Sequence, residues 1–540
     1  MASIRPPQVS GKGAVDANLP AATSARRGSH LLATSSPRVG NRVERGSVCI
    51  SRAKSSGAVI SHITESPEDL KSQSLERPAD SLAQPRGLSR TTSKVGVITV
   101  EDISKSVHAI ILAGGSADNP LARYRAMPAV ELGSSTQLID ISISNCIRSG
   151  VNKLYVLTQF NSHTLNTHIS QAYPPAVFGG PQKQGFVDVL AAHQTPTEAS
   201  WYRGSADAVR RNLPVILEDY RGSMLPDDML ILSGQALYRM DYGVLLRTHR
   251  ESNADITIAT HAVGRKQAVL RGITKVERDT GLVTDFEEKP SSERLAQLEG
   301  VSKNASGEDP FEASMGIYMF KREVLEKLLD RHSAGNNSKP DAHFGYDVIP
   351  HALEDGLRIV AHNHPGYWRD VNSLRDFYEV NLELAMPGAP ISFYEVEEGI
   401  VSSGQVLPPA LISNCEIEDA LIGEGSVLRR SKILGCVIGN NSYIGEGCVL
   451  EKSLVLGNDY YTNEKTRAAS LEKGESALGV GKNCVVKGAI LDDNVSIGDD
   501  CQITNKDGMT EADRTEEGYV IQDGIVTILR NAVIPAGTVI

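Results

Sequence analysis

The last quarter of this 540-residue chain carries apolar residues at intervals of six. Three series share this spacing: Ile438, Ile444, Leu450 and Leu456; Val485, Leu491, Ile497 and Ile503; and Ile528, Ile534 and Ile540. Corners rich in Gly, Asn and Asp separate them. A hexapeptide period is typical of a left-handed parallel β-helix, because each six-residue side of the coil turns one apolar residue inward. We therefore expect a left-handed β-helix over residues 404–540, with residues 458–479 looping out where the period breaks.

Residues 105–385 show a different pattern, which indicates an α/β domain. Residues 107–112 form a short apolar run that ends at Gly114 and Gly115, as expected for a buried strand followed by a tight turn. Further apolar runs lie at 153–158, 229–232, 256–260, 317–320 and 357–361, with helical stretches such as 205–220 and 322–329 between them. Strands that alternate with helices favour a Rossmann-like domain with a mostly parallel sheet. The stretch 386–403, rich in Pro and Gly at its start, reads as a linker.

The first 104 residues are predicted to lie outside the fold. Residues 1–57 hold nine Lys and Arg, two acids and ten Ser, which is the composition of an organellar transit peptide. Residues 58–104 are polar and rich in Ser and Pro, and we expect a disordered lead-in there. The net charge of −11 therefore belongs to an acidic body, which argues against nucleic acid as the main partner. No run of 18 apolar residues occurs, so we expect no membrane span.

Six motifs occur in one order along the α/β region and carry a specific resemblance. They are LTQFNS (157–162), GFVDVLAA (185–192), WYRGSADAV (201–209), LYRMDY (237–242), EKP (288–290) and ASMGIY (313–318). Together they closely resemble ADP-glucose pyrophosphorylase, also called glucose-1-phosphate adenylyltransferase, over about residues 107–540. That family joins a nucleotidyltransferase domain to a left-handed β-helix. It makes ADP-glucose and pyrophosphate from ATP and glucose 1-phosphate, for starch or glycogen.

The resemblance implies an intact site for the sugar phosphate. Glu288 would bind the sugar hydroxyls and Lys289 would hold the phosphate, a task that suits the point charge of a lysine. Three further residues, Tyr202, Gly272 and Ser314, fall where the family has its other glucose 1-phosphate contacts.

The same resemblance implies a damaged site for the nucleotide. The glycine-rich loop retains Gly114 and Gly115, and Gly204 and Asp207 would be further nucleotide contacts. Asn119 marks the loss of an arginine, in a shortened loop where Asp118 would repel a triphosphate. Met127 replaces a lysine, so Arg125 is the one matching catalytic cation of this stretch.

The expected Mg²⁺ site also loses one of its two carboxylates. Gln235 stands where the family has a metal-binding Asp, and a neutral amide is a poor Mg²⁺ ligand beside phosphates. Asp370 matches the second carboxylate. Because phosphoryl transfer depends on cations around the phosphates, we expect very low adenylyltransferase activity from the chain alone.

Several short sequence segments resemble those of the large, regulatory subunit of the plant heterotetramer. The partner of that subunit is a catalytic small subunit in the plastid. Arg514 and Arg530 fall where the family binds anionic effectors such as 3-phosphoglycerate or phosphate. Chloroplast and mitochondrion cannot be separated by the composition of residues 1–57 alone. The resemblance to plant-type subunits favours the plastid.

Three other functions compete with this hypothesis. A non-enzymatic sensor would bind glucose 1-phosphate or ADP-glucose and tune a catalytic partner. Hexapeptide coils also occur in acyltransferases, but those use a His in the coil and residues 404–540 contain none. A nucleotidyltransferase for another sugar or base is the third, since the altered loop leaves the nucleotide open.

Overall fold

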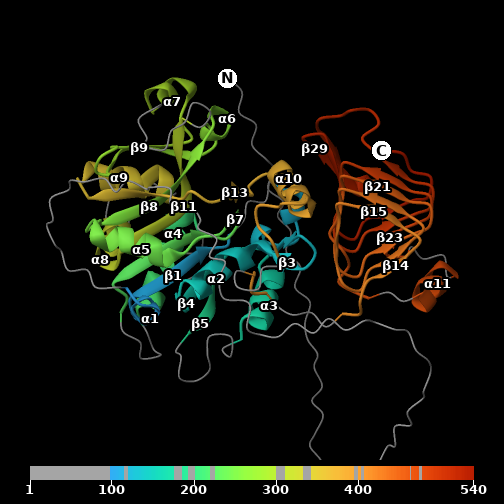
Figure 1. The fold of residues 1–540 in the computed structure, drawn as a ribbon, viewed down its shortest axis with the longest axis horizontal. Helices are drawn as coiled ribbons and strands as arrows, with labels where there is room; N and C mark the ends of the chain where they lie inside the picture. The colour runs from blue at the N-terminus through green and yellow to red at the C-terminus, as the bar shows by residue number, and fades with distance from the viewer. Residues whose placement is uncertain are drawn as a thin grey trace, which may run out of the picture. The chain divides into compact units, whose positions relative to one another are not determined.

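The computed structural model describes eleven stretches of the chain (Figure 1). They are residues 98–114, 119–174, 185–192, 201–218, 225–298, 310–331, 342–393, 399–402, 407–461, 464–472 and 477–540. The predictions for residues 1–57, Gly115 and Asp118 fall outside these stretches. The predicted disorder of residues 58–104 is wrong at its end, because helix α1 forms over Val100–Ser106. Thr99 and Asp102 start α1 with a capping box.

A nine-stranded mixed sheet forms the centre of the first domain (Figure 1). Its strands are β1 (Val107–Leu112), β4 (Lys153–Thr158), β5 (Phe186–Ala191), β6 (Asp228–Ser233), β8 (Ile256–Val263), β9 (Gly272–Val276), β10 (Val283–Glu288), β11 (Phe311–Lys321) and β12 (Ile359–Asn363). The order is β10-β9-β11-β6-β1-β4-β5, with β8 beside β11 and β12 beside β8. Strands β6, β1, β4 and β5 run parallel, whereas β11 is antiparallel to its neighbours. The sheet therefore has a parallel part, β6-β1-β4-β5, and a mixed part beyond β11, in which β10 is antiparallel to β9 and β12 is parallel to β8.

Helices cover this sheet on both faces, as the two buried clusters on either side of it show. The further helices of the first domain are α2 (Leu138–Arg148), α3 (His163–Ala172), α4 (Ser205–Leu217), α5 (Tyr242–Glu251), α6 (Arg265–Ala268), α7 (Ser292–Leu298), α8 (Arg322–Arg331), η4 (Phe344–Val348), α9 (Ile349–Glu354) and α10 (Leu374–Ala385). Short elements complete it: η1 (Pro120–Ala122), η2 (Met127–Ala129), β2 (Glu131–Leu132), β3 (Thr136–Gln137), β7 (Ala236–Tyr238) and β13 (Trp368–Asp370). Alternate residues of β1 face opposite clusters, which explains its unbroken apolar run.

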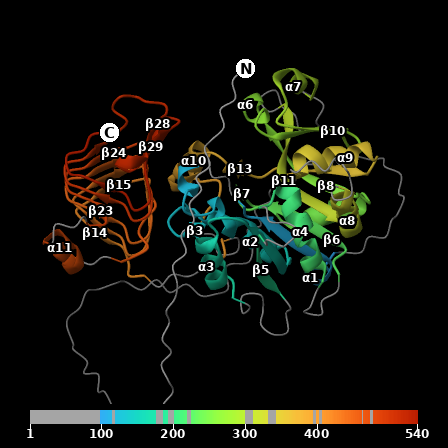
Figure 2. The same ribbon diagram turned by 180° about the vertical axis from the view of Figure 1, so that it is seen from behind.

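The C-terminal domain is a three-sided parallel β-helix, whose stacked strands are visible from both sides (Figure 1 and Figure 2). The first side holds β14 (Leu411–Ser413), β17 (Val427–Arg429), β20 (Tyr443–Ile444), β23 (Gly479–Val480), β26 (Ser496–Ile497) and β31 (Val533–Ile534). The second holds β15 (Glu416–Glu418), β18 (Lys432–Leu434), β21 (Val449–Glu451), β24 (Val485–Lys487) and β27 (Gln502–Ile503). The third holds β16 (Leu421–Ile422), β19 (Val437–Ile438), β22 (Leu454–Val455), β25 (Ala489–Leu491) and β30 (Ile525–Ile528).

Two residues of the hexapeptide series lie elsewhere than predicted. Val486, not Val485, joins the core of the coil, and Val455 takes the place predicted for Leu456. The steps from Leu450 to Val455 and from Val486 to Leu491 are five residues and not six, so the inward position falls one residue before Leu456 and one residue after Val485. Asn residues with positive φ, such as Asn441 (55°) and Asn483 (54°), form the corners.

Two insertions interrupt the coil. Helix α11 (Glu464–Glu472) lies within the segment predicted to loop out, and it projects from the side of the coil in both views (Figure 1 and Figure 2). Strands β28 (Ala512–Arg514) and β29 (Tyr519–Gln522) form an antiparallel hairpin on β30. Helix α10 contacts β19 and β22, so Leu456 and Ile490 join the core of the first domain. No described helix is long and apolar enough to cross a membrane.

Candidate active site

A pocket of about 660 Å³ opens at the carboxyl ends of β1, β4 and β6, where α/β domains bind ligands. We call it the central pocket. Its lining residues are Leu112, Gly114, Asn119, Met127, Leu157, Gln159, Tyr202, Gly204, Ser205, Ala208, Gln235, Lys289, His343, Asn372, Ser373, Leu374 and Gln522. Seven residues singled out from the sequence are thus brought together: Gly114, Asn119, Met127, Tyr202, Gly204, Gln235 and Lys289. The pocket draws on both domains, because Gln522 belongs to β29.

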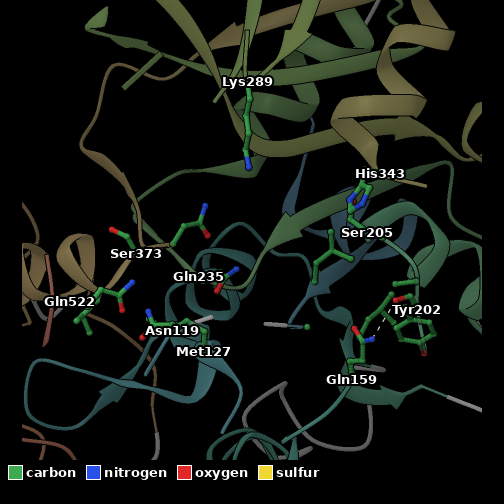
Figure 3. Close-up of a pocket in the computed structure, with 17 residues that line it drawn as sticks. Asn119, Met127, Gln159, Tyr202, Ser205, Gln235, Lys289, His343, Ser373 and Gln522 are labelled. Carbon is green, nitrogen blue, oxygen red and sulfur yellow. Dashed lines mark hydrogen bonds between the residues drawn. The ribbon is translucent and has the colours of Figure 1, made fainter. Parts of the chain in front are cut away.

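One side of the central pocket is uncharged. Asn119 caps η1 by accepting a hydrogen bond from Leu121 N at 3.0 Å, and Met127 is buried. Gln235 follows β6 and lies between them and Lys289 (Figure 3). The positions at which the sequence suggested lost nucleotide-activating residues therefore do face the pocket, and they offer no charge to a phosphate.

Lys289 enters the central pocket from the opposite side (Figure 3). Among the lining residues that the structure describes, it is the only lysine or arginine. The residue directly follows β10, has a φ of 51°, and its backbone N donates to Arg271 O at 2.9 Å. The strand pair β9–β10 thus fixes the backbone of the one cation in the described part of the pocket lining.

Glu288, Gly272 and Ser314 lie on three adjacent strands beside Lys289 but do not line the central pocket. Glu288 pairs with Gly272 in the β10–β9 register, and a Cβ on Gly272 would come within 2.6 Å of Glu288 Oε2. The buried ring of Phe286 would come equally close, so a larger residue at this position would force one of these side chains to move. Burial raises the pKa of Glu288, although Lys289 and Arg271 oppose this. Ser314 donates to Tyr318 Oη at 3.2 Å.

The N-terminal turn of α4 forms another part of the wall. Gly204 has a φ of 108°, and a Cβ there would collide with Ala342 O. Tyr202 accepts a hydrogen bond from Asn212 Nδ2 at 2.8 Å, which orients its ring at the pocket. Burial raises the pKa of Tyr202.

Asp207 was predicted to contact the nucleotide, but its carboxylate is already occupied. It accepts from Arg203 N at 3.0 Å and forms ion pairs with Arg210 (2.7 Å) and Arg211 (2.9 Å). Burial alone would raise the pKa of Asp207, but these hydrogen bonds lower it. Asp207 thus holds the first turn of α4 together and does not line the central pocket.

Arg125 departs most from its predicted catalytic role. It does not line the central pocket. Its guanidinium forms ion pairs with Asp493 and, at 2.6 Å, with Asp492, both in the β-helix domain. The side chain is 3% exposed. A buried guanidinium held by two carboxylates is not available to a phosphate, so Arg125 joins the two domains here.

The predicted effector residue Arg530 belongs to the same cluster. It pairs with Asp493 at 3.0 Å and with Asp459 at 2.5 Å, so an anionic effector would have to displace a carboxylate. Arg514 lies on the surface, where its Nη1 is 3.5 Å from Glu517 Oε1. We call the group Arg125, Asp492, Asp493, Arg530, Asp459 and the neighbouring Glu131 the interdomain cluster.

The residues predicted to hold Mg²⁺ do not fit a divalent cation. Asp370 pairs with Ala236 in the β13–β7 register, and Val371 N donates to Gln235 O at 2.9 Å, so Asp370 lies beside Gln235. However, Gln235 is neutral and Asp370 forms an ion pair with Arg271. Within the described stretches, no group of three or more His, Cys, Asp or Glu side chains is arranged to hold a metal.

Sequence reasoning missed several residues of the pocket wall, such as Ser205, His343 and Ser373. Ser373 could have been found, because Ser373 and Asp376 form a capping box at the start of α10, a local pattern. His343 lies in no recognisable motif; it precedes η4, and its backbone N donates to Asp347 Oδ2 at 2.8 Å.

Two comparisons with family models bear on this geometry. The model for nucleotidyl transferases matches residues 108–386. The model for the GLGC left-handed parallel β-helix domain matches residues 405–539. These matches confirm the predicted fold class, including the handedness of the coil. Nucleotidyl transferases generally use a divalent metal such as Mg²⁺, so the donor set around Asp370 is unusual for that family.

Proposed function

This chain belongs to the nucleotidyl transferase family, and its two domains are those of a sugar-phosphate nucleotidyltransferase like ADP-glucose pyrophosphorylase; from that premise we propose that it is a regulatory subunit of such an enzyme with little activity of its own. The observation that carries this proposal is the uneven charge of the central pocket. Lys289 remains on the side of the sugar phosphate, while Asn119, Met127 and Gln235 leave the opposite side neutral.

The expected loss of rate follows from the missing charges. Displacement at phosphorus builds negative charge on the phosphoryl oxygens, and removing one stabilising donor costs about 2.7–4 kcal/mol. Arg125 cannot compensate, because Asp492 and Asp493 already hold it. Three altered positions therefore lower the rate by about 10³-fold or more.

We further propose the setting of this function. The substrates of the assembly are ATP and glucose 1-phosphate, and its product ADP-glucose serves starch synthesis. The partner is a catalytic small subunit in a heterotetramer. Residues 1–57 direct the chain to the plastid. Imaging of these residues fused to a fluorescent protein tests this, and a signal in mitochondria would contradict it. Anionic effectors act weakly on this chain, since Arg530 is already paired.

The decisive experiment measures ADP-glucose formation by the chain alone and by the chain co-expressed with a catalytic small subunit. We expect negligible turnover by the chain alone, and a changed effector response of the partner in the co-purified complex. Turnover by the chain alone that approaches that of the partner would contradict the proposal, as would failure to co-purify.

A non-enzymatic sensor is the second candidate, and the pairing of Asp370 with Arg271 favours it. Calorimetry with glucose 1-phosphate and with ADP-glucose separates the two. If the chain is a sensor, it binds one of these ligands, and the bound ligand changes the activity of the partner. The chain itself then contributes no turnover to any complex.

A further inference from the structure

Asp370 matches one of the two carboxylates that would hold Mg²⁺ in the family, yet it already accepts hydrogen bonds from protein donors. Oδ2 accepts from Arg271 Nη1 and, at 2.6 Å, from Asn372 Nδ2. Both partners of the ion pair are mostly buried, with side-chain exposures of 15% for Arg271 and 16% for Asp370. A buried ion pair is costly to break, so a metal would have to displace Arg271 from Asp370 against a substantial cost.

Arg271 is held in place from a second direction. Its guanidinium lies over the ring of Trp368, 5.4 Å from the ring centroid, and Trp368 is two residues before Asp370 on β13. Such cation–π stacking favours a guanidinium in one orientation. The same short strand therefore supplies both the carboxylate and the aromatic surface that receive Arg271.

Arg271 and Lys289 come from the same end of the β9–β10 pair. Arg271 directly precedes β9, Lys289 directly follows β10, and Lys289 N donates to Arg271 O. One cation thus turns to Asp370 while the other enters the central pocket. Protein groups alone hold the side chain of Arg271, and Arg271 O fixes the backbone of Lys289.

We propose that Arg271 takes the place of a divalent cation at Asp370, so that the central pocket binds a sugar monophosphate through Lys289 without a metal. This inference rests on the proposed function for the identity of the sugar phosphate. A phosphomonoester carries about 1.5–2 negative charges near neutral pH, and one lysine neutralises about one of them. A nucleoside triphosphate carries more charge and meets a neutral wall at Asn119, Met127 and Gln235, so it binds much more weakly to this pocket.

The first experiment titrates the whole chain with glucose 1-phosphate by calorimetry, once in EDTA and once in MgCl₂. We expect dissociation constants that agree within about two-fold, and a loss of about ten-fold or more in EDTA would overturn the inference. Absence of binding in both buffers would contradict the proposed function. The inference would then be decided by the metal titration below, which needs no sugar phosphate.

The second experiment measures bound Mn²⁺ by electron paramagnetic resonance, with circular dichroism to confirm folding. The wild type is expected to bind no Mn²⁺ at micromolar concentrations, and the double variant Arg271→Gln/Gln235→Asp to gain one site. A tight Mn²⁺ site in the wild type, or a folded double variant that binds none, would overturn the inference. Arg294→Gln/Gln235→Asp is the matched control, because Arg294 also forms an ion pair, with Asp285 at 2.6 Å on β10. It is expected to gain no site.

Discussion

The ion pairs of Arg125 with Asp492 and Asp493 make a prediction about how the two domains are held together. Arg125→Ala leaves both aspartates buried without their shared cation, since the side chains of Arg125 and Asp492 are each 3% exposed. Removing one partner of a buried pair lowers the free energy of unfolding by about 3–5 kcal/mol. For a cooperative unit of roughly 430 residues, the entropy of unfolding is near 0.9 kcal/mol/K, which corresponds to a fall in Tm of about 3–6 °C.

Differential scanning calorimetry at a fixed scan rate measures this change. Arg123→Ala is the matched control, because Arg123 lies in the same loop and also reaches the β-helix domain, but it donates to the neutral Thr515 Oγ1 at 2.8 Å. We expect that control to cost about 1 kcal/mol. The double variant Arg125→Ala/Asp492→Ala should be less destabilised than the sum of the single variants, by about 1–3 kcal/mol.

The reasoning is refuted if Arg125→Ala melts within a degree of the wild type, or if the two substitutions are additive. A variant that keeps its Tm but loses affinity for a nucleotide would instead return Arg125 to the catalytic role predicted from the sequence. The two roles are therefore separated by one pair of measurements.

Two further predictions concern Lys289 and Glu131. Lys289→Ala removes the one cation among the described lining residues and should raise the dissociation constant for glucose 1-phosphate by about 10–100-fold in calorimetry. Lys275→Ala on β9 should leave this constant unchanged, and equal effects of the two substitutions would contradict the assignment. Burial, and next the carboxylate of Asp493, raises the pKa of Glu131 to about 8 from an ordinary value of 4.5. The folded state then binds more protons than the unfolded state between these values, so stability falls as the pH rises from about 4.5 through 8. Glu131→Gln should flatten the dependence of Tm on pH in this window, and an unchanged slope would show that Glu131 does not titrate there.

The strands of the first domain were predictable because their signal is local. β1 and β4 span the residues of the predicted apolar runs, since a strand buried on both faces has no polar face to interrupt it. The period of six identified the coil, but it could not place Val485 and Leu456, because the length of each side depends on how neighbouring coils stack. The antiparallel pairing of β11 with β6, β8 and β9 was not foreseen, because strand direction is set by connections and not by composition.

Site residues were predictable only where the local backbone structure of a motif determines the position of the side chain. Lys289 and Tyr202 reach the pocket as expected, because their strands and helices follow from local pattern. Arg125 finds its acids 367 and 368 residues further along the chain, and Arg271 finds Asp370 at a separation of 99, so no sequence window contains these pairs.

The position of Arg125 has a consequence for how such a chain can change. Arg125 lies between the pocket-lining residues Asn119 and Met127 in the sequence, and Glu131 follows four residues after Met127, so the wall of the pocket and the joint between the domains are built from one segment. A substitution that freed Arg125 for a phosphate would at the same time loosen that joint. Recovered activity and retained stability are therefore opposed at this residue. Mutations that reinforce α10 or the coil would have to come first, and the order of steps back towards catalysis is restricted.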